Sequence, residues 1–341
     1  MELDGRKKKI LKTIINEYVD TAEPVSSGSI IKKYPVNLSS ATIRNEMLEL
    51  EKLGYLKKPY SSSGRVPSEL GYRYYVEKLI SDDRLSVEDI AKIKEKLEKR
   101  AYNLEELTKL TCSTISEITH YTSIAIGPDK SNDKIDSIEF IRLKPNVIMV
   151  LIITDLGLVK ESVIKFDQNI SDETISELKI LFTNKLVGHS LKTIEGSIDD
   201  YIIDEVNIGL DIIKKVIDEI NNVIKENFIH IDPNMTQLGN PEFADNELRE
   251  EYLKILRNPK VIVETIDDDN NDISIRIAGE KDGLENFSVI SLRPKLNNID
   301  IGTISVLAPK RMDYKKVVLT MKALLEELSS GLYDEDEGED K

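Results

Sequence analysis

A predicted helix that begins near Ser40 carries side chains able to read the edges of DNA bases. In the major groove, arginine donates two hydrogen bonds to guanine and asparagine pairs with adenine, so Arg44 and Asn45 suit base recognition. Ala41 and the methyl group of Thr42 are small enough for close approach, while Ser40 adds a hydroxyl near the start of the helix. All five residues lie on less than about two turns, which is the reach of a recognition helix.

The rest of this helix has the pattern of a helix packed on one side. On a helical wheel Ile43, Met47 and Leu50 fall on one face, which should pack on two preceding helices, and the polar residues fall opposite. Two alternatives remain open. The helix could be an ordinary exposed helix of mixed polarity, and helix-turn-helix geometry also occurs in winged domains that bind proteins.

A basic hairpin is predicted directly after this helix. Lys57, Lys58 and Arg65 bracket the segment PYSSSG, whose small hydroxyl residues include Ser63. Small residues let the backbone reach phosphates, and the cations can neutralise phosphates or enter a minor groove. Arg73 continues the basic character in the next predicted helix. The alternative is a basic hairpin that is merely solvated.

The neighbouring segments supply the elements that would position these residues. Hydrophobic spacing predicts a helix over residues 5–20, SGSIIKKY is typical of a second helix, and Ser39 or Ser40 can cap the third. After the hairpin, ELGYRYYVEKLI favours another helix. Three short helices and a hairpin are the layout of a winged helix-turn-helix, which we expect over residues 1–84.

Charge is distributed unevenly along the chain. Residues 1–80 hold 14 Lys and Arg against 10 Asp and Glu, a net charge of +4 within a total of −15, which leaves −19 for the remainder. A basic module ahead of an acidic body indicates a polyanionic partner for the basic part. The acidic segment 333–341 is expected to be a solvated tail.

Composition indicates the compartment. Hydrophobic residues make up 40% of the chain, enough for sizeable cores, and the single cysteine, Cys112, excludes an internal disulfide framework. No apolar run approaches the ~18–20 residues of a membrane span, and the N-terminal stretch lacks the pattern of a signal peptide. We therefore expect a cytoplasmic protein that makes no membrane contact.

Strand patterns lie on both sides of a mostly helical block at about 168–258. The strands predicted before it are SIAIGP, KIDSIEFIRL, VIMVLIIT and LVKESVIKF, and those after it are ISIRIAG, FSVISLRP and IGTISVLAP. A sheet interrupted by a helical insertion explains this order better than two sequential domains. One long helix is expected from Ser86 toward residue 119, and a closing helix from Asp313 to Leu332.

A helix predicted over residues 204–228 carries an apolar seam at spacings of 3, 4, 3 and 4. The seam consists of Leu210, Ile213, Ile217, Ile220 and Ile224. It could contact a second copy of the chain, or it could pack inside its own subunit, and the sequence favours neither.

Catalytic and metal sites are not expected. The sequence contains neither GxxxxGK[ST] nor GxGxxG, so no phosphate-binding loop is predicted. Cys112 lacks a neighbouring base, and the three histidines are far apart. We therefore predict no catalytic residue, no metal ligand and no cofactor. Near the C-terminus, Arg311, Asp313 and Tyr314 are expected to cap and brace the last helix.

Two long motifs resemble a known family. SSATIRNEMLELEKLGYL followed by SSSGRVPSELGYRYYV closely resembles the HrcA family, the heat-inducible transcription repressors of bacteria. GNPEF at 239–243 and APKRMDY at 308–314 agree with that resemblance, which runs from the first helix to about residue 332.

The resemblance implies an α+β multidomain fold. Its parts would be an N-terminal winged helix-turn-helix, a GAF-like α/β domain and a mainly helical inserted dimerisation domain. We expect them at residues 1–84, at 85–167 together with 259–332, and at 168–258, with the tail at 333–341 outside the family pattern.

The resemblance also implies a function. Members of the family repress heat-shock chaperone operons, bind an inverted-repeat operator called CIRCE as homodimers, and depend on a GroEL-type chaperonin for activity. A ligand-sensing regulator that uses the GAF-like domain is the main alternative, and a winged domain that binds proteins is a second. No enzymatic activity is expected.

Overall fold

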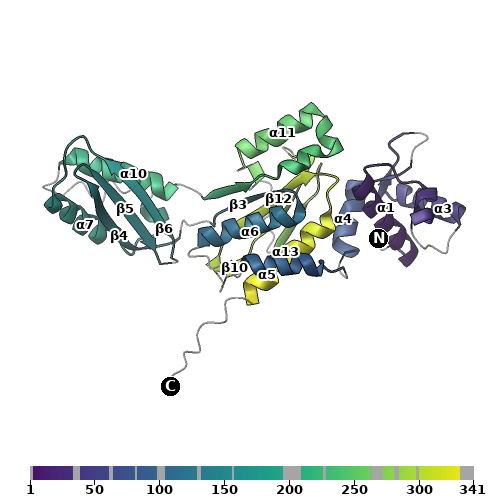
Figure 1. Ribbon diagram of the computed structural model, residues 1–341, viewed down its shortest axis with the longest axis horizontal. Helices are drawn as coiled ribbons and strands as arrows, with labels where there is room; N and C mark the ends of the chain where they lie inside the picture. The colour runs from purple at the N-terminus through teal and green to yellow at the C-terminus, as the bar shows by residue number, and fades with distance from the viewer. Residues whose placement is uncertain are drawn as a thin grey trace, which may run out of the picture.

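The computed structural model describes most of the chain and arranges it as three units in a row (Figure 1). The residues described are 3–33, 39–60, 64–80, 83–97, 104–128, 132–155, 157–194, 209–225, 228–259, 261–262, 272–279, 284–296 and 299–330. The N-terminal unit lies at one end, a central unit built on a five-stranded sheet lies in the middle, and a unit built on a three-stranded sheet lies at the other end.

The N-terminal unit contains the helices and hairpin predicted from the sequence. Its elements are α1 (Gly5–Thr21), α2 (Ser27–Lys33), α3 (Ser40–Lys52), β1 (Leu56–Lys57), β2 (Val66–Pro67) and α4 (Glu69–Lys78). Side-chain caps define where the helices begin: Ser39 accepts a hydrogen bond from the Thr42 amide, and Ser68 accepts one from the Gly71 amide. β1 and β2 pair antiparallel, and Ile43, Met47 and Leu50 are buried as the wheel predicts.

The central unit is an antiparallel sheet with the strand order β7-β3-β12-β9-β8. The strands are β3 (Thr122–Ile126), β7 (Ile229–Asp232), β8 (Ile273–Arg276), β9 (Phe287–Leu292) and β12 (Thr303–Pro309), and β10 (Lys295–Leu296) pairs with β11 (Ile299–Asp300) in a small hairpin. Helices cover both faces of the sheet, so its strands are buried on both sides.

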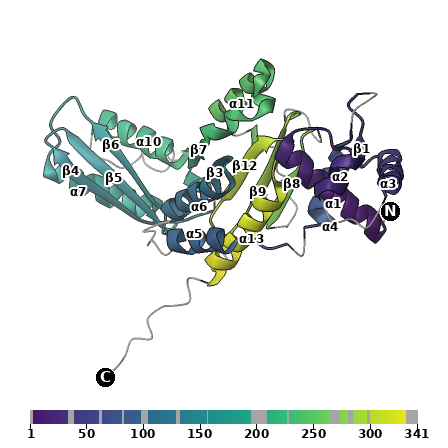
Figure 2. The ribbon, with the colours of Figure 1, turned by 45° about the vertical axis from the view of Figure 1, so that its right-hand side comes forward.

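Each face of the central sheet has its own helices (Figure 2). One face packs against α5 (Val87–Leu97), α6 (Leu104–Thr119) and α13 (Tyr314–Ser330), in a core that continues into the N-terminal unit. The other face packs against the 3₁₀ helices η1 (Met235–Gly239) and η2 (Pro241–Ala244) and against α11 (Asn246–Arg257).

The third unit has a separate hydrophobic core. Its strands β4 (Ile135–Lys144), β5 (Val147–Thr154) and β6 (Val159–Lys165) form an antiparallel meander, and its helices are α7 (Asp172–Leu186), α8 (Leu191–Ile194) and α10 (Leu210–Lys225). Among the residues that the structure describes, helices cover one face of this sheet, where Phe140 of β4 contacts Phe182 of α7 at a ring separation of 5.6 Å.

The structure corrects the expected extent and composition of the insertion. The central sheet is interrupted, but β4, β5 and β6 belong to the inserted unit rather than to the interrupted sheet, so the insertion is not mainly helical. The inserted part begins near residue 135 and its last helix ends at Lys225, whereas we expected it at 168–258. β7 and α11 return to the central unit. The short turns between β4, β5 and β6 favour pairing among neighbours, and strand patterns alone do not show which sheet a strand joins.

The single long helix expected over residues 86–119 is instead two helices. α5 ends at Leu97 and α6 begins at Leu104, and the two pack against each other and against α13. The two helices bury Ile93 and Ile115 in one core, which one continuous helix of that length would not do.

The structure distinguishes the two alternatives for the seam on α10. Ile213, Ile217 and Ile220 are buried within their own subunit, in the core formed with the three-stranded sheet. These three residues are therefore not available to a second copy. The side chains of Leu210 and Ile224, and the tail at 333–341, lie outside the described residues.

Within the described ranges, no helix is long and apolar enough to cross a membrane.

The only cysteine of the chain should be chemically inert in the folded protein. Cys112 is fully buried in α6, and this burial raises the pKa of its thiol to about 12. We expect the reactive thiolate to be roughly 10³-fold scarcer than for a free thiol, so a disulfide reagent such as Ellman's should label the native protein only as it unfolds. Labelling in denaturant is the control. Rapid labelling in native buffer would contradict the burial.

Candidate DNA-binding surface

One face of α3 presents the polar residues that the sequence singles out. Ser40, Ala41, Arg44 and Asn45 are exposed and Thr42 is half-buried, opposite the apolar face that anchors the helix. Among the described residues, no hydrogen bond or ion pair engages the side chains of Arg44 and Asn45. The structure therefore brings the five predicted residues together on one solvent-facing surface, which we call the α3 surface.

The two hydroxyls on this surface also hold the start of α3 in place. The Thr42 hydroxyl lies 2.9 Å from the hydroxyl of the capping residue Ser39, and the Ser40 hydroxyl lies 3.3 Å from that of Ser27 in α2. A hydroxyl can donate one bond and still accept others, so both groups keep acceptor capacity toward solvent.

Two acidic residues of α3, Glu46 and Glu49, are paired with cations from α1. Lys7 lies 3.1 Å from Glu46 and 2.8 Å from Glu49, and Arg6 lies 3.3 Å from Glu46. The hydrogen bonds that Lys7 donates to Glu49, Asp4 and Glu46 raise its pKa. Because these pairs neutralise the carboxylates beside it, the α3 surface retains the positive charge of Arg44. This pairing was not predictable from the sequence, since the partners are about 40 residues apart.

The four cations predicted on the hairpin and α4 differ in exposure and pairing. Lys58 is exposed, and no ion pair to another described residue involves it. Lys57 instead lies 2.6 Å from Glu69. Arg65 is only 12% exposed, and two of its nitrogens lie 2.8 and 2.7 Å from one oxygen of Glu51 at the end of α3.

Arg73 also differs from the expectation. Its guanidinium donates a 2.9 Å hydrogen bond to the carbonyl of Ile275 in β8, so it faces the central unit rather than the α3 surface. Lys57, Arg65 and Arg73 thus hold the N-terminal unit together or attach it to the central unit. Ser63 lies outside the described residues.

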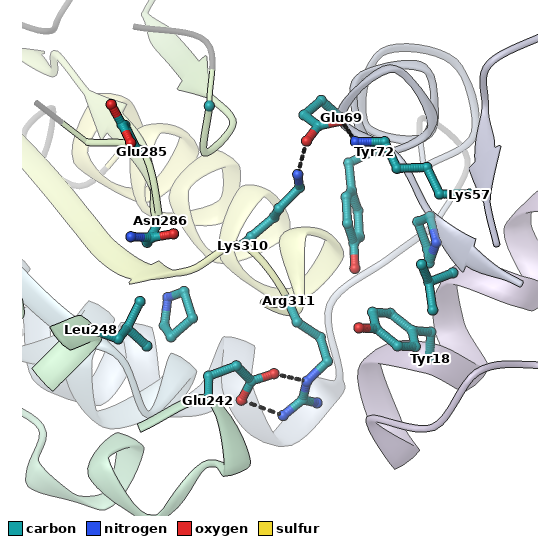
Figure 3. A pocket seen from close by; sticks show the side chains of 14 residues that line it. Tyr18, Lys57, Glu69, Tyr72, Glu242, Leu248, Glu285, Asn286, Lys310 and Arg311 are labelled. Atoms are coloured by element: carbon teal, nitrogen blue, oxygen red, sulfur yellow. Dashed lines mark hydrogen bonds and ion pairs between the residues drawn. The ribbon is translucent and has the colours of Figure 1, made fainter. Parts of the chain in front are cut away.

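A cavity of about 740 Å³ lies where the N-terminal unit meets the central unit (Figure 3). Tyr18, Lys57, Glu69 and Tyr72 line it from the N-terminal side; Glu242, Lys310 and Arg311 are among the residues that line it from the other side. Sequence reasoning missed this site because its residues come from distant parts of the chain. The motifs GNPEF and APKRMDY, which contain the last three of these residues, were the available signal.

The expectation for the last helix is confirmed at two of its three residues. Asp313 accepts a 2.9 Å hydrogen bond from the Lys316 amide and so caps α13. The Tyr314 hydroxyl donates a 2.8 Å bond to the Lys310 carbonyl and so braces the turn before the helix. Arg311 makes its contacts elsewhere, with Glu242 and with the carbonyl of Val19.

An ion pair across this cavity should make stability depend on acid. Burial favours the neutral form of Glu69, but hydrogen bonds from Lys310 and Lys57 outweigh it and lower the pKa of Glu69 to about 2. The charged form therefore stabilises the fold above the ordinary pKa of 4.5, and that contribution is lost as the pH falls from 4.5 toward 2.

The variant Glu69→Gln tests this pH dependence. In urea unfolding, the parent should be more stable than the variant at neutral pH, and the difference should shrink as the pH falls below 4.5. A difference that stays constant over this interval would show that the charge of Glu69 is not responsible. Glu77→Gln, on the same helix but with a carboxylate 3.9 Å from its arginine partner, is the matched control.

Known proteins are similar to this chain in fold and in sequence. A solved structure described as that of a hypothetical protein is 22% identical, has a TM-score of 0.70 and matches 96% of this chain and 98% of its own, which shows a common fold. A family model described as HrcA protein C terminal domain matches residues 105–318. Two relatives named heat-inducible transcription repressor HrcA come from Acetivibrio thermocellus and Thermoanaerobacter pseudethanolicus. They are 33% and 34% identical, over 93% and 98% of this chain and 93% and 100% of their own lengths.

The polar α3 surface on a unit of short helices, together with these relatives, defines a transcription regulator of the repressor class. Because relatives above 30% identity cover nearly its whole length, the chain belongs to the HrcA family of heat-inducible transcription repressors. This family is not enzymatic.

Proposed function

We propose that the chain represses heat-shock chaperone operons by binding an inverted-repeat operator of the CIRCE type through a winged helix-turn-helix. The observation that supports it most is the α3 surface, where Arg44 and Asn45 face solvent while two acidic residues of the same helix are paired with α1. The hairpin would act as the wing and place Lys58 near the DNA backbone.

A binding titration tests the operator assignment. An inverted-repeat duplex from upstream of a chaperonin operon and a scrambled duplex of equal composition are titrated at two salt concentrations. Specific recognition predicts tighter binding of the inverted repeat by about 10³-fold or more, and nonspecific binding that weakens steeply with salt. If the folded dimer binds the two duplexes with equal affinity, the proposal is refuted and a winged domain that binds proteins is favoured.

Lys58 should contribute affinity without sequence preference. Because its exposed ammonium group makes no ion pair with another described residue, the variant Lys58→Ala should weaken the binding of operator and scrambled DNA by a similar factor. It should also reduce the slope of log affinity against log salt by about one unit. The matched control is Lys57→Ala, whose ammonium already pairs with Glu69 and whose salt slope should change less. An unchanged slope for Lys58→Ala would remove this residue from the interface.

The finer architecture is also part of the proposal. The central unit would be the GAF-like domain, and the unit of β4–β6, α7, α8 and α10 would be the inserted dimerisation domain. Its support is the topology: a central antiparallel sheet with helices on both faces, interrupted by a unit with its own core.

An inverted repeat requires a protein with two-fold symmetry, so we propose a homodimer. Its best-supported contact surface is the open face of the three-stranded sheet, opposite α7 and α10. Strand register aligns Ile141, Met149 and Val163 in one apolar row across this face, and Val163 is 57% exposed. We call this face the open sheet face.

Charge on the open sheet face is arranged to match a second copy. In β6, the exposed residues Glu161 and Lys165 lie two positions to either side of Val163, on the same face. A two-fold axis that passes through the apolar row, across the strands, places Glu161 of each copy opposite Lys165 of its partner. The apolar row then meets itself, as an isologous interface requires.

Modulation by a GroEL-type chaperonin is proposed from family membership. The repressor would stay folded only with help, so that misfolded protein elsewhere, by occupying the chaperonin, releases the operon. Operator affinity measured after a cycle of heating and cooling should fall without chaperonin and recover when chaperonin and ATP are added. Full affinity after the cycle, with no effect of chaperonin, would refute this mechanism.

A ligand-sensing regulator remains the second candidate, and the junction cavity is the observation that favours it. The Tyr72 hydroxyl is buried beside the cavity and has no hydrogen-bond partner among the described residues, which is a position that a bound polar molecule could satisfy. A ligand at about 100 times its dissociation constant would stabilise the fold by about 2.7 kcal/mol. A metabolite screen should then raise the melting temperature of the parent more than that of Tyr72→Phe. No shift with any metabolite would exclude this candidate.

A further inference from the structure

Arg311 joins three segments that are far apart in the sequence (Figure 3). It follows β12 and precedes α13, and its guanidinium donates two hydrogen bonds to the carboxylate of Glu242 in η2, one of them 3.0 Å long. A third donor binds the carbonyl of Val19 in α1. The Arg311 side chain is only 12% exposed, so these contacts are largely protected from water and salt.

The contact with Val19 fulfils a need at the end of α1. The last carbonyls of a helix have no partner inside the helix, and a cation there also complements the helix dipole. α1 has no basic residue in its own last turn, so the central unit supplies the cation through Arg311.

α1 and α3 are packed and paired with each other. Ile10 and Ile14 of α1 share a core with Ile43 of α3, and Lys7 of α1 pairs with carboxylates on α3. A contact that fixes the end of α1 against the central unit therefore fixes the direction of the α3 surface as well.

We propose that Arg311 is a positioning residue that sets the orientation of the α3 surface, and thus the spacing between the two DNA-reading helices of a dimer. This inference rests on the proposed function. An inverted repeat presents its half-sites about 34–36 Å, or a multiple of that distance, apart, so the two α3 surfaces must be held at matching distance and angle. Glu242 holds the guanidinium in place, and Arg311 carries the orientation into α1.

Lys310 supports the same junction from the opposite side. It pairs with Glu69 at the start of α4, while Arg311, the next residue, contacts the end of α1. Lys310 and Arg311 thus attach the central unit to the N-terminal unit at two places, the start of α4 and the end of α1. Because Glu69 is about one-third exposed, we assign the larger role to Arg311.

The test compares DNA probes that differ only in geometry. The probes are a single half-site, the inverted repeat from upstream of a chaperonin operon, and the same repeat with half a helical turn, about 5 base pairs, added between the half-sites. The variant Arg311→Met/Glu242→Leu replaces the whole ion pair by apolar side chains, because removing one partner would leave a buried charge unpaired. Arg142→Met, which removes a two-nitrogen contact with Asp172 in the inserted unit, is the matched control.

We expect the parent and Arg142→Met to lose at least about tenfold in affinity when the spacer is lengthened. The double variant should lose less than about threefold, while its half-site affinity stays within about twofold of the parent. If the ion pair only stabilised the fold, the double variant would lose affinity for the half-site and for the full repeat alike, and its spacer preference would stay. Should the double variant fail to fold, as judged by thermal unfolding, Arg311→Lys serves instead, because one ammonium cannot reach both Glu242 and Val19.

Two results would overturn the inference. One is a folded double variant that keeps the spacer preference of the parent; the other is an equal loss on the half-site and on the full repeat. If the parent itself binds the inverted repeat no better than scrambled DNA, the proposed function has failed and this inference fails with it.

Discussion

Replacing Val163 by glutamate should split the dimer and lower the affinity for the full inverted repeat by about 10²–10⁴-fold, because a second half-site then binds without the benefit of linkage. Val163 is 57% exposed on the open sheet face, so the charge is solvated in the monomer. In the dimer, two carboxylates would face each other across the apolar row, where desolvation and repulsion both oppose association.

Sedimentation and half-site binding make the result specific. The variant should sediment as a monomer and keep the half-site affinity and melting temperature of the parent, since exposed substitutions usually change stability by less than about 0.5 kcal/mol. Ile180→Glu is the matched control, because Ile180 is 62% exposed on α7, away from the open sheet face. A Val163→Glu protein that remains dimeric would place the interface elsewhere.

A charge exchange tests the proposed symmetry. Glu161→Lys should weaken the dimer, since each new lysine would oppose Lys165 of its partner, and so should Lys165→Glu. The combination of both substitutions should restore much of the lost association, because the pairing is then reversed rather than removed. Additive losses in the double variant would contradict an axis through the apolar row.

The N-terminal unit was predictable because its signals are local. Caps such as Ser39 and Ser68, and the apolar spacing of Ile43, Met47 and Leu50, act within a few residues. The predicted helices and hairpin therefore match α1–α4, β1 and β2 closely. The five residues of the α3 surface follow from the same periodicity, because a helix that buries one face leaves the opposite face exposed.

Long-range partners were not predictable. Arg65 of the hairpin pairs with Glu51 of α3, and Arg73 binds the carbonyl of Ile275, which is 202 residues away. The same basic residues fit a DNA contact equally well when only their charge is known. The boundaries of the insertion were mispredicted for a related reason. β3 and β4 are both recognisable as strands, but the sequence does not show that they join different sheets.

The second large effect is expected at the α3 surface itself. Arg44→Ala should weaken operator binding by about 1–3 kcal/mol and relax the preference at one base pair of each half-site, because a bidentate contact with guanine is lost. Arg44 is exposed and, among the described residues, makes no ion pair, so the substitution should leave the fold intact. Asn45→Ala should act similarly at a neighbouring adenine.

Comparison with random DNA separates base reading from charge. A residue that reads bases loses affinity on the operator and little on a scrambled duplex, whereas a residue that only neutralises phosphate loses both alike. Arg44→Lys is the most informative variant, because it keeps the charge but not the two-pronged donor geometry, and it should therefore lose discrimination while keeping most of the nonspecific affinity. Equal losses on operator and random DNA for Arg44→Ala would show that Arg44 contacts the backbone, and would leave the sequence preference to other residues of α3.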